Sequence, residues 1–338
     1  MSATPAMPPT AEATLPIGRT FFHPAVDYLL IGGLISVPFI AMVGFDRSLF
    51  PLGAASVAIA IMVNYAHFSA STVRLYTRPG LAKSMPFLAW GFPILWAALT
   101  IACLVFADLL AHNFWKLYQS WSPYHYAAQT FGICMMYAGR SGVKLGGGAR
   151  SWLWWVCMLP FAWAFVTGAN ESGLAWFVDM EALRATPILG TGYDVLGWGL
   201  AIASFAVPIA FFFTAGRRMP LIAIVLVATN ALWWTFLSYD DAWAWAAIAH
   251  SIQYLLIVGV FDARDHVPEG QSRVRRGLVF YALCVLLGIL MFVALPVGVA
   301  IGFGMEMTVA VQVLAAGVIL HHFIVDGFIW RRKRVGVG

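Results

Sequence analysis

Histidine is the residue type in this chain whose positions best suggest chemistry. Five of the eight histidines fall inside otherwise apolar stretches: His67, His125, His250, His321 and His322. Ionisable side chains in such surroundings are costly and commonly functional. Neutral imidazole is a good ligand for iron, copper and zinc, and a carboxylate joins it at oxygen-activating iron. The sequence therefore predicts a metal site built from these histidines.

Polar residues accompany the histidines at helical spacing, where positions three or four apart share a face. Amides occupy this position beside three of them: Asn64 before His67, Gln129 after His125, and Gln253 after His250. A ligating histidine usually donates its second N–H to such a group, which fixes its tautomer. We therefore expect the three amides to support the cofactor ligands.

A carboxylate and a phenol complete the pattern. Asp326 lies four residues after His322, and Tyr254 lies four after His250. We expect both to act in catalysis, with Asp326 alternatively a ligand. Neighbours on a helix point about 100° apart, so His321 and His322 are not expected to bind one ion equally well. His322 shares its face with Asp326 and is the favoured ligand of the two.

The depth of these residues in the membrane is compatible with either one site or two sites. From the helical rise, His67 and His322 lie about 10 Å from the predicted cytoplasmic ends of their segments, and His125 and His250 about 18–21 Å. Helix tilt could gather all four around one centre. Otherwise an outer pair and an inner pair would form two levels.

The composition shows what holds these residues. The chain is 61% hydrophobic and only 10% charged, with a mean hydropathy of +0.81, whereas soluble domains carry about 25% charged residues. Its apolar runs are long and unbroken, as a membrane-spanning helix requires. We predict an all-α polytopic integral membrane bundle.

Ten spans are predicted in the 338-residue chain, at about 25–45, 51–73, 86–111, 117–139, 151–168, 194–214, 220–238, 242–262, 277–303 and 307–329. The N-terminal tail, the loops after even-numbered spans and the C-terminus hold seventeen of the twenty Lys and Arg residues. This asymmetry predicts that both termini are cytoplasmic. We expect a bacterial inner membrane, with the basic residues against lipid headgroups, and no nucleic-acid partner is needed to explain the charge.

Three regions are expected along the chain. Residues 1–24, rich in Pro, Ala and Thr, read as a disordered tail, residues 25–330 as one transmembrane domain, and residues 331–338 as a basic cytoplasmic tail. The four cysteines are scattered singly within apolar segments, so they predict neither a disulfide framework nor a thiolate metal site.

These features favour a histidine-ligated metal oxidoreductase, with non-haem iron as the expected metal and a lipophilic small molecule as the substrate. An apolar pocket would shield reactive oxygen intermediates from water. Three alternatives stay open. Histidine pairs on two helices could hold haem b for electron transfer, the same His and Asp residues could serve a proton-coupled transporter, or the histidines could only bond between helices.

Known membrane metal proteins share parts of this pattern. The H-x-x-x-H and H-x-x-H-H boxes of fatty-acid desaturases are absent. Haem-copper oxidases place a histidine on their second span and carry a His-His pair, but their further paired ligands are missing. The chain resembles bacterial membrane carotenoid-cleaving dioxygenases only in general plan, with histidines on several spans. No residue role is transferred from any of these families.

Overall fold

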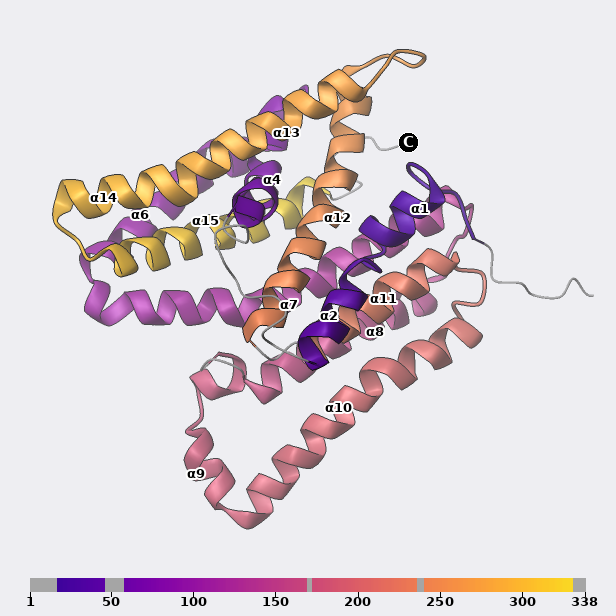
Figure 1. Ribbon diagram of the computed structural model, residues 1–338, viewed down its shortest axis with the longest axis horizontal. Helices are drawn as coiled ribbons and strands as arrows, with labels where there is room; N and C mark the ends of the chain where they lie inside the picture. The colour runs from indigo at the N-terminus through magenta and orange to yellow at the C-terminus, as the bar shows by residue number, and fades with distance from the viewer. Residues whose placement is uncertain (1–16, 46–57, 169–171, 236–239, 331–338) are drawn as a thin grey trace, which may run out of the picture.

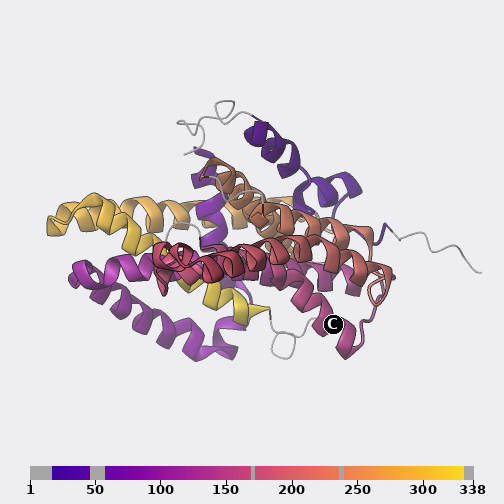
Figure 2. The same cartoon turned by 90° about the horizontal axis from the view of Figure 1, so that it is seen from below.

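The computed structural model describes residues 17–45, 58–168, 172–235 and 240–330 (Figures 1 and 2). Over these ranges the chain is helical and contains no strand, which confirms the predicted all-α class. The longer α-helices are α2 (Ser36–Phe45), α4 (Ala66–Thr77), α6 (Phe92–Val105), α7 (Ala107–Arg140), α8 (Gly147–Thr167), α10 (Pro187–Phe213), α11 (Leu221–Thr235), α12 (Asp240–His266), α13 (Val274–Ile289), α14 (Leu295–Phe303) and α15 (Met307–Ile329).

Shorter helical segments join or extend these helices. They are α1 (Pro24–Val26), α5 (Leu81–Ser84), α9 (Met180–Ala185), the 3₁₀ helix η6 (Gly173–Trp176), and the π-helices η1 (Asp27–Ile31), η3 (Ala60–Tyr65), η4 (Phe87–Gly91) and η7 (Leu290–Ala294). π-helical turns are rare and often occur at functional sites. Here η3 leads directly into the helix that carries His67.

Five apolar helices of the described chain are long enough to cross a membrane, which fits a membrane protein. They are Phe87–Val105, Pro187–Phe213, Trp245–His266, Val274–Phe303 and Met307–Ile329. A sixth span results if the bent pair Pro24–Ile31 and Ser36–Met42 is counted as one. The predicted count of ten is therefore not confirmed, because other predicted segments form helices that are shorter or more polar, and residues 46–57 lie outside the described ranges.

Two of the five apolar helices form the centre of the bundle. In the apolar stretches of α12 and α15, 61% of the residues are buried, against 22–28% in the other three. Figure 1 shows α12 crossing the middle of the molecule, between the α13–α15 group and the group of α8, α10 and α11. Helix α7 contacts α15, α8 and α11. The predicted histidines on α7, α12 and α15 therefore lie on interior helices.

A close contact between helices positions the segment that carries His67. A Cβ built on Gly288 of α13 would lie 2.8 Å from the carbonyl carbon of Tyr65, so only glycine allows this approach. The Tyr65 ring stacks on Phe292 at 4.5 Å. Because His67 follows Tyr65 by two residues, this contact fixes where the imidazole enters the bundle.

The first apolar segment is broken. Its two halves meet at 42°, and Gly33 at the break has a φ of 79°, a conformation that favours glycine. Side chains satisfy the freed backbone: the Ser36 hydroxyl donates to Gly33 O at 2.6 Å, and Thr229 donates to Gly32 O at 2.9 Å. Unwound backbone at membrane depth persists only when it is buried in protein in this way.

One end of the bundle is held by polar contacts. Buried Asp27 accepts hydrogen bonds from the backbone amides of Phe21 and Phe22 and from the Tyr137 hydroxyl. These bonds place residues 21 and 22, the end of the predicted N-terminal tail, against the bundle. Residues 1–16 of that tail and the whole 331–338 tail lie outside the described residues.

An ion-pair network ties α4, α12 and α13 together at the ends where these helices lie close. The Arg276 guanidinium donates to both carboxylate oxygens of Asp262, at 2.5 and 3.0 Å, and the Asp262 side chain is fully buried. Arg74 pairs with Asp265 at 2.9 Å. The charge distribution predicts that Arg74 and Arg276 lie on the same face of the membrane.

Candidate metal centre

Four of the five predicted histidines meet in one group: His67 from α4, His125 from α7, His250 from α12 and His322 from α15. The ring centroids of His67 lie 4.5 Å from His322, 5.0 Å from His250 and 6.0 Å from His125. His125 lies 5.0 Å from His322 and 5.3 Å from His250. All four are buried, with 0–5% of each residue exposed. The rings form a single centre, not an outer and an inner pair.

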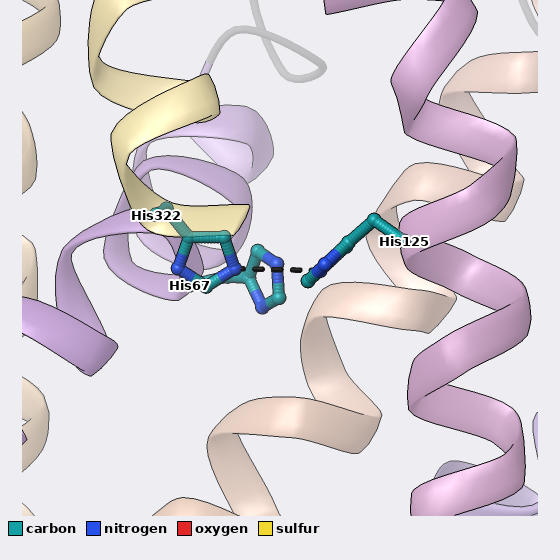
Figure 3. Close-up of side chains that lie close together, drawn as sticks. All are labelled: His67, His125 and His322. Carbon is teal, nitrogen blue, oxygen red and sulfur yellow. Dashed lines mark hydrogen bonds between the residues drawn. The ribbon is translucent and has the colours of Figure 1, made fainter. Parts of the chain in front are cut away.

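Three of these rings are close enough to share one metal ion. His67, His125 and His322 each offer a nitrogen, and these nitrogens lie within 4.8 Å of one another. Figure 3 shows the three rings converging, with the dashed line joining His125 and His322. This buried group could therefore bind a metal.

The spacing of His125 and His322 suits two ligands of one ion. Their Nε2 atoms are 3.4 Å apart. Two nitrogens at about 2.1 Å from one ion are separated by about 3.0 Å at an octahedral ion and by about 3.4 Å at a tetrahedral ion. A direct N–H···N bond between the rings has a typical length of about 2.7–3.2 Å. The 3.4 Å spacing is at the long end of a hydrogen bond between the rings and also allows both nitrogens to bind one ion.

His67 gives the second geometric test of whether a metal fits. Both of its ring nitrogens are buried without a hydrogen-bond partner, and the residue is fully buried. A buried polar atom left unsatisfied costs about 1–3 kcal/mol. If His67 only packed between helices, both of its nitrogens would stay without a hydrogen-bond partner. An ion between the rings would bind one of them. The donor set thus fits a metal.

Side chains around the group fix the rings. Ser71 Oγ lies 2.9 Å from His322 Nδ1, which leaves Nε2 of that ring facing His125. The His125 ring stacks on Phe323 at 4.3 Å. The His250 ring stacks on Tyr126 at 3.7 Å, with an interplanar angle of 7°. Aromatic stacking restricts ring rotation, so these imidazoles are held in one orientation.

The predicted amides take partly different positions. Gln129 approaches His250 and not His125: its Nε2 lies 3.2 Å from His250 Nδ1 and 3.3 Å from the His250 carbonyl oxygen. Asn64 accepts a hydrogen bond from the Ser251 hydroxyl at 2.9 Å, which joins η3 to α12. Gln253 lies at the broken first segment, where its Nε2 is 3.3 Å from the position of a Cβ on Gly33.

Asp326 and Tyr254 form a pair at the edge of the centre. The Tyr254 hydroxyl and the Trp330 indole N–H both donate to Asp326 Oδ1, the indole at 2.8 Å. The Tyr254 ring lies 4.7 Å from His67 and 5.4 Å from His322, measured between centroids. Asp326 is therefore linked to the histidines indirectly: it bonds to the Tyr254 hydroxyl, and the Tyr254 ring contacts His67 and His322.

His321 lies apart from the group. Its ring stacks on Phe92 of α6 at 5.2 Å, with an interplanar angle of 16°. It is half-buried, while its neighbour His322 is fully buried. The roughly 100° between neighbours on a helix turns one imidazole into the centre and the other toward α6.

Two side chains that shape the centre, Tyr126 and Phe323, carry no sequence signal, and the partner of a third, Ser71, could not be predicted. Tyr126 and Phe323 each follow a predicted ligand by one residue, and Ser71 stands four residues after His67 but bonds to His322. Helical spacing signals that Ser71 belongs to the polar face, but it does not say which neighbouring helix supplies its partner.

No protein-family model, curated protein or solved structure matches this chain.

Proposed function

We propose that this protein is a membrane-embedded metal oxidoreductase whose ion is held by His67, His125 and His322. The metal we propose is non-haem iron, and the substrate is a lipophilic small molecule that arrives from the bilayer. The observation that carries the proposal is the set of buried nitrogens: two on His67 without any partner, and two Nε2 atoms spaced 3.4 Å apart.

Iron is favoured by the number and type of ligands. Three imidazoles would leave coordination positions open, as oxygen-activating non-haem iron requires, and the Asp326 carboxylate is hydrogen-bonded to Tyr254, whose ring packs against His67. When bound, iron would supply the activation of dioxygen. The protein's own side chains hold the imidazoles in place and exclude water, because every ring of the group is buried.

A lipophilic substrate fits the surroundings of the centre. Phe68 lies 4.9 Å from His67 and 5.4 Å from His322, and Phe323 covers His125. Phe68 and Phe323 belong to an apolar cluster that extends between α6, α7 and α15. Groups of this kind offer dispersion contacts and few hydrogen bonds, so they suit an apolar molecule.

Haem b is a weaker candidate for the same residues. Axial imidazoles stand on opposite faces of a flat macrocycle. Here the His67 ring lies within 6.0 Å of three other imidazoles, so a macrocycle placed between any two rings would displace the others. The packing favours a single ion.

A proton-coupled transporter is the second candidate, and the broken first segment is the observation that favours it. Discontinuous helices commonly form substrate or ion sites in transporters. The break at Gly33 lies beside Gln253, on the same helix as His250. The backbone carbonyl groups at the break nevertheless accept hydrogen bonds from Ser36 and Thr229. These bonds explain the break as a structural feature.

Elemental analysis with an absorption spectrum of the detergent-purified protein tests the proposal. We expect iron without a Soret band. A Soret band would replace the proposal with haem b. A protein with neither metal nor chromophore would contradict both metal functions, and ion-flux assays in liposomes would then test transport.

We also propose ten spans in a bacterial inner membrane, with both termini cytoplasmic. Support comes from the segregation of seventeen of twenty basic residues to one predicted face. Reporter fusions at each end of the chain test this orientation, and a periplasmic signal from either end would contradict it.

A further inference from the structure

His250 lies beside the candidate ion but differs from the three proposed ligands. It is buried, and its ring lies 5.0 Å from His67 and 5.3 Å from His125. Yet the nitrogens that approach one another within 4.8 Å belong to the other three histidines. A histidine in this position has either a coordinating role or a hydrogen-bonding role, and the position of its ring proton separates the two.

The contact with Gln129 fixes that proton. Gln129 Nε2 lies 3.3 Å from the His250 backbone carbonyl oxygen, which can only accept a hydrogen bond. This contact identifies the atom as the NH₂ group of the amide, because an amide oxygen there would face another oxygen. The same NH₂ lies 3.2 Å from His250 Nδ1. Nδ1 therefore accepts, and in a neutral imidazole the proton is then on Nε2.

A protonated Nε2 cannot coordinate a metal, because its lone pair is replaced by an N–H bond. It can only donate a hydrogen bond. In the described structure this Nε2 is buried and has no partner, although a buried donor without an acceptor costs about 1–3 kcal/mol. The stacking on Tyr126 prevents the ring from turning toward another acceptor. The residues that the structure describes therefore supply no acceptor for this N–H.

We infer that His250 is a hydrogen-bond donor to a small exogenous ligand of the ion, and not a ligand of the ion itself. This inference rests on the proposed metal centre. The chemical class of the acceptor is a small anion or dioxygen at an open coordination position. Preorganised donors of this kind stabilise developing negative charge in a water-excluded site. Gln129 is the positioning residue, since it selects the tautomer.

The tautomer can be measured without any metal. Nitrogen NMR of metal-free protein labelled with ¹⁵N-histidine distinguishes Nε2–H from Nδ1–H, and the His250→Phe variant assigns the signal. We expect Nε2–H in the wild type. Nδ1–H would overturn the inference whether or not the protein binds metal, so this result is independent of the proposed function.

The role is tested with Co²⁺ as the metal probe and azide as the exogenous ligand. His250→Phe keeps an aromatic ring against Tyr126 but removes the donor. We expect it to retain Co²⁺ and to bind azide about ten- to a hundredfold more weakly, as the loss of a hydrogen bond to a charged group predicts. His321→Phe is the matched control and should change neither quantity, because His321 stacks on Phe92 outside the centre.

Two outcomes of this experiment would overturn the inference. Loss of Co²⁺ in His250→Phe would make His250 a ligand, and unchanged azide affinity would leave it with no role at the ion. Gln129→Glu gives an independent check, because a carboxylate accepts from Nδ1–H and moves the proton off Nε2. We expect this variant to acquire His250 as an additional ligand, seen as a changed Co²⁺ absorption spectrum. An unchanged spectrum would contradict the proposed control by Gln129.

Discussion

Adjacent histidines on α15 provide the sharpest test of the metal centre. His322→Ala and His321→Ala remove the same side chain from neighbouring positions of one helix. Only His322 lies in the group of nitrogens within 4.8 Å, while His321 stacks on Phe92 of α6. We expect His322→Ala to lose bound metal and His321→Ala to retain it.

The size of the effect follows from the number of ligands. Structural zinc sites with four ligands bind with apparent free energies of about 10–16 kcal/mol, or about 2.5–4 kcal/mol for each ligand. Removing one ligand should therefore raise the dissociation constant roughly 10²- to 10³-fold. His321→Ala removes one stacking contact, which should lower the free energy of unfolding by about 0.5–1.5 kcal/mol. It should leave the metal affinity unchanged.

Equilibrium dialysis of the purified proteins against buffered Fe²⁺, followed by elemental analysis, measures both dissociation constants. Size-exclusion profiles in detergent check that each variant is inserted and folded. Equal metal retention by the two variants would refute the ligand assignment. Equal loss would show that the metal depends on the whole α15 surface and not on the imidazole that faces the centre.

Three further substitutions test the surroundings of the centre. Ser71→Ala removes the hydroxyl that orients the proposed imidazole ligand on α15, so metal affinity should fall about 10- to 100-fold in dialysis. Gly288→Ala should destabilise the protein by about 1–3 kcal/mol in thermal unfolding, whereas Gly298→Ala, with no atom within 4 Å of its Cβ, should be neutral; equal effects would contradict the packing argument. Arg276→Met leaves a fully buried carboxylate without its bidentate partner, so it should lower stability by about 3–5 kcal/mol. Its neighbour Arg275 is exposed, and Arg275→Met should leave the unfolding temperature unchanged.

The helical class and the approximate positions of the long apolar helices could be predicted from the apolar runs. Backbone groups must be satisfied within each segment in lipid, so long apolar runs leave few alternatives to helices. The number of spans could not be predicted as safely. Helix α7 runs without interruption from Ala107 to Arg140. The predicted span at 117–139 is therefore only part of a longer helix, and the added N-terminal part is more polar than the predicted span.

The meeting of the histidines could be inferred from polar residues at helical spacing, but their hydrogen-bond partners could not. Residues four apart share a face, and that face packs against other helices in a bundle. Gln129 therefore bonds to His250 on α12 and not to His125 on its own helix. Ser71 likewise bonds to His322. Spacing identifies the face, whereas the partner depends on helix rotation and register, which the sequence does not contain.

Two kinds of side chain surround the histidine group, and both bear on the chemistry proposed for it. The Tyr254 ring packs against His67 and His322, and its hydroxyl donates a hydrogen bond to Asp326. Phe68 and Phe323 cover the rings with aromatic surface. The proposed oxidation of an apolar substrate is consistent with this arrangement, because the aromatic rings would offer dispersion contacts and the Tyr254–Asp326 pair would offer a proton donor and acceptor.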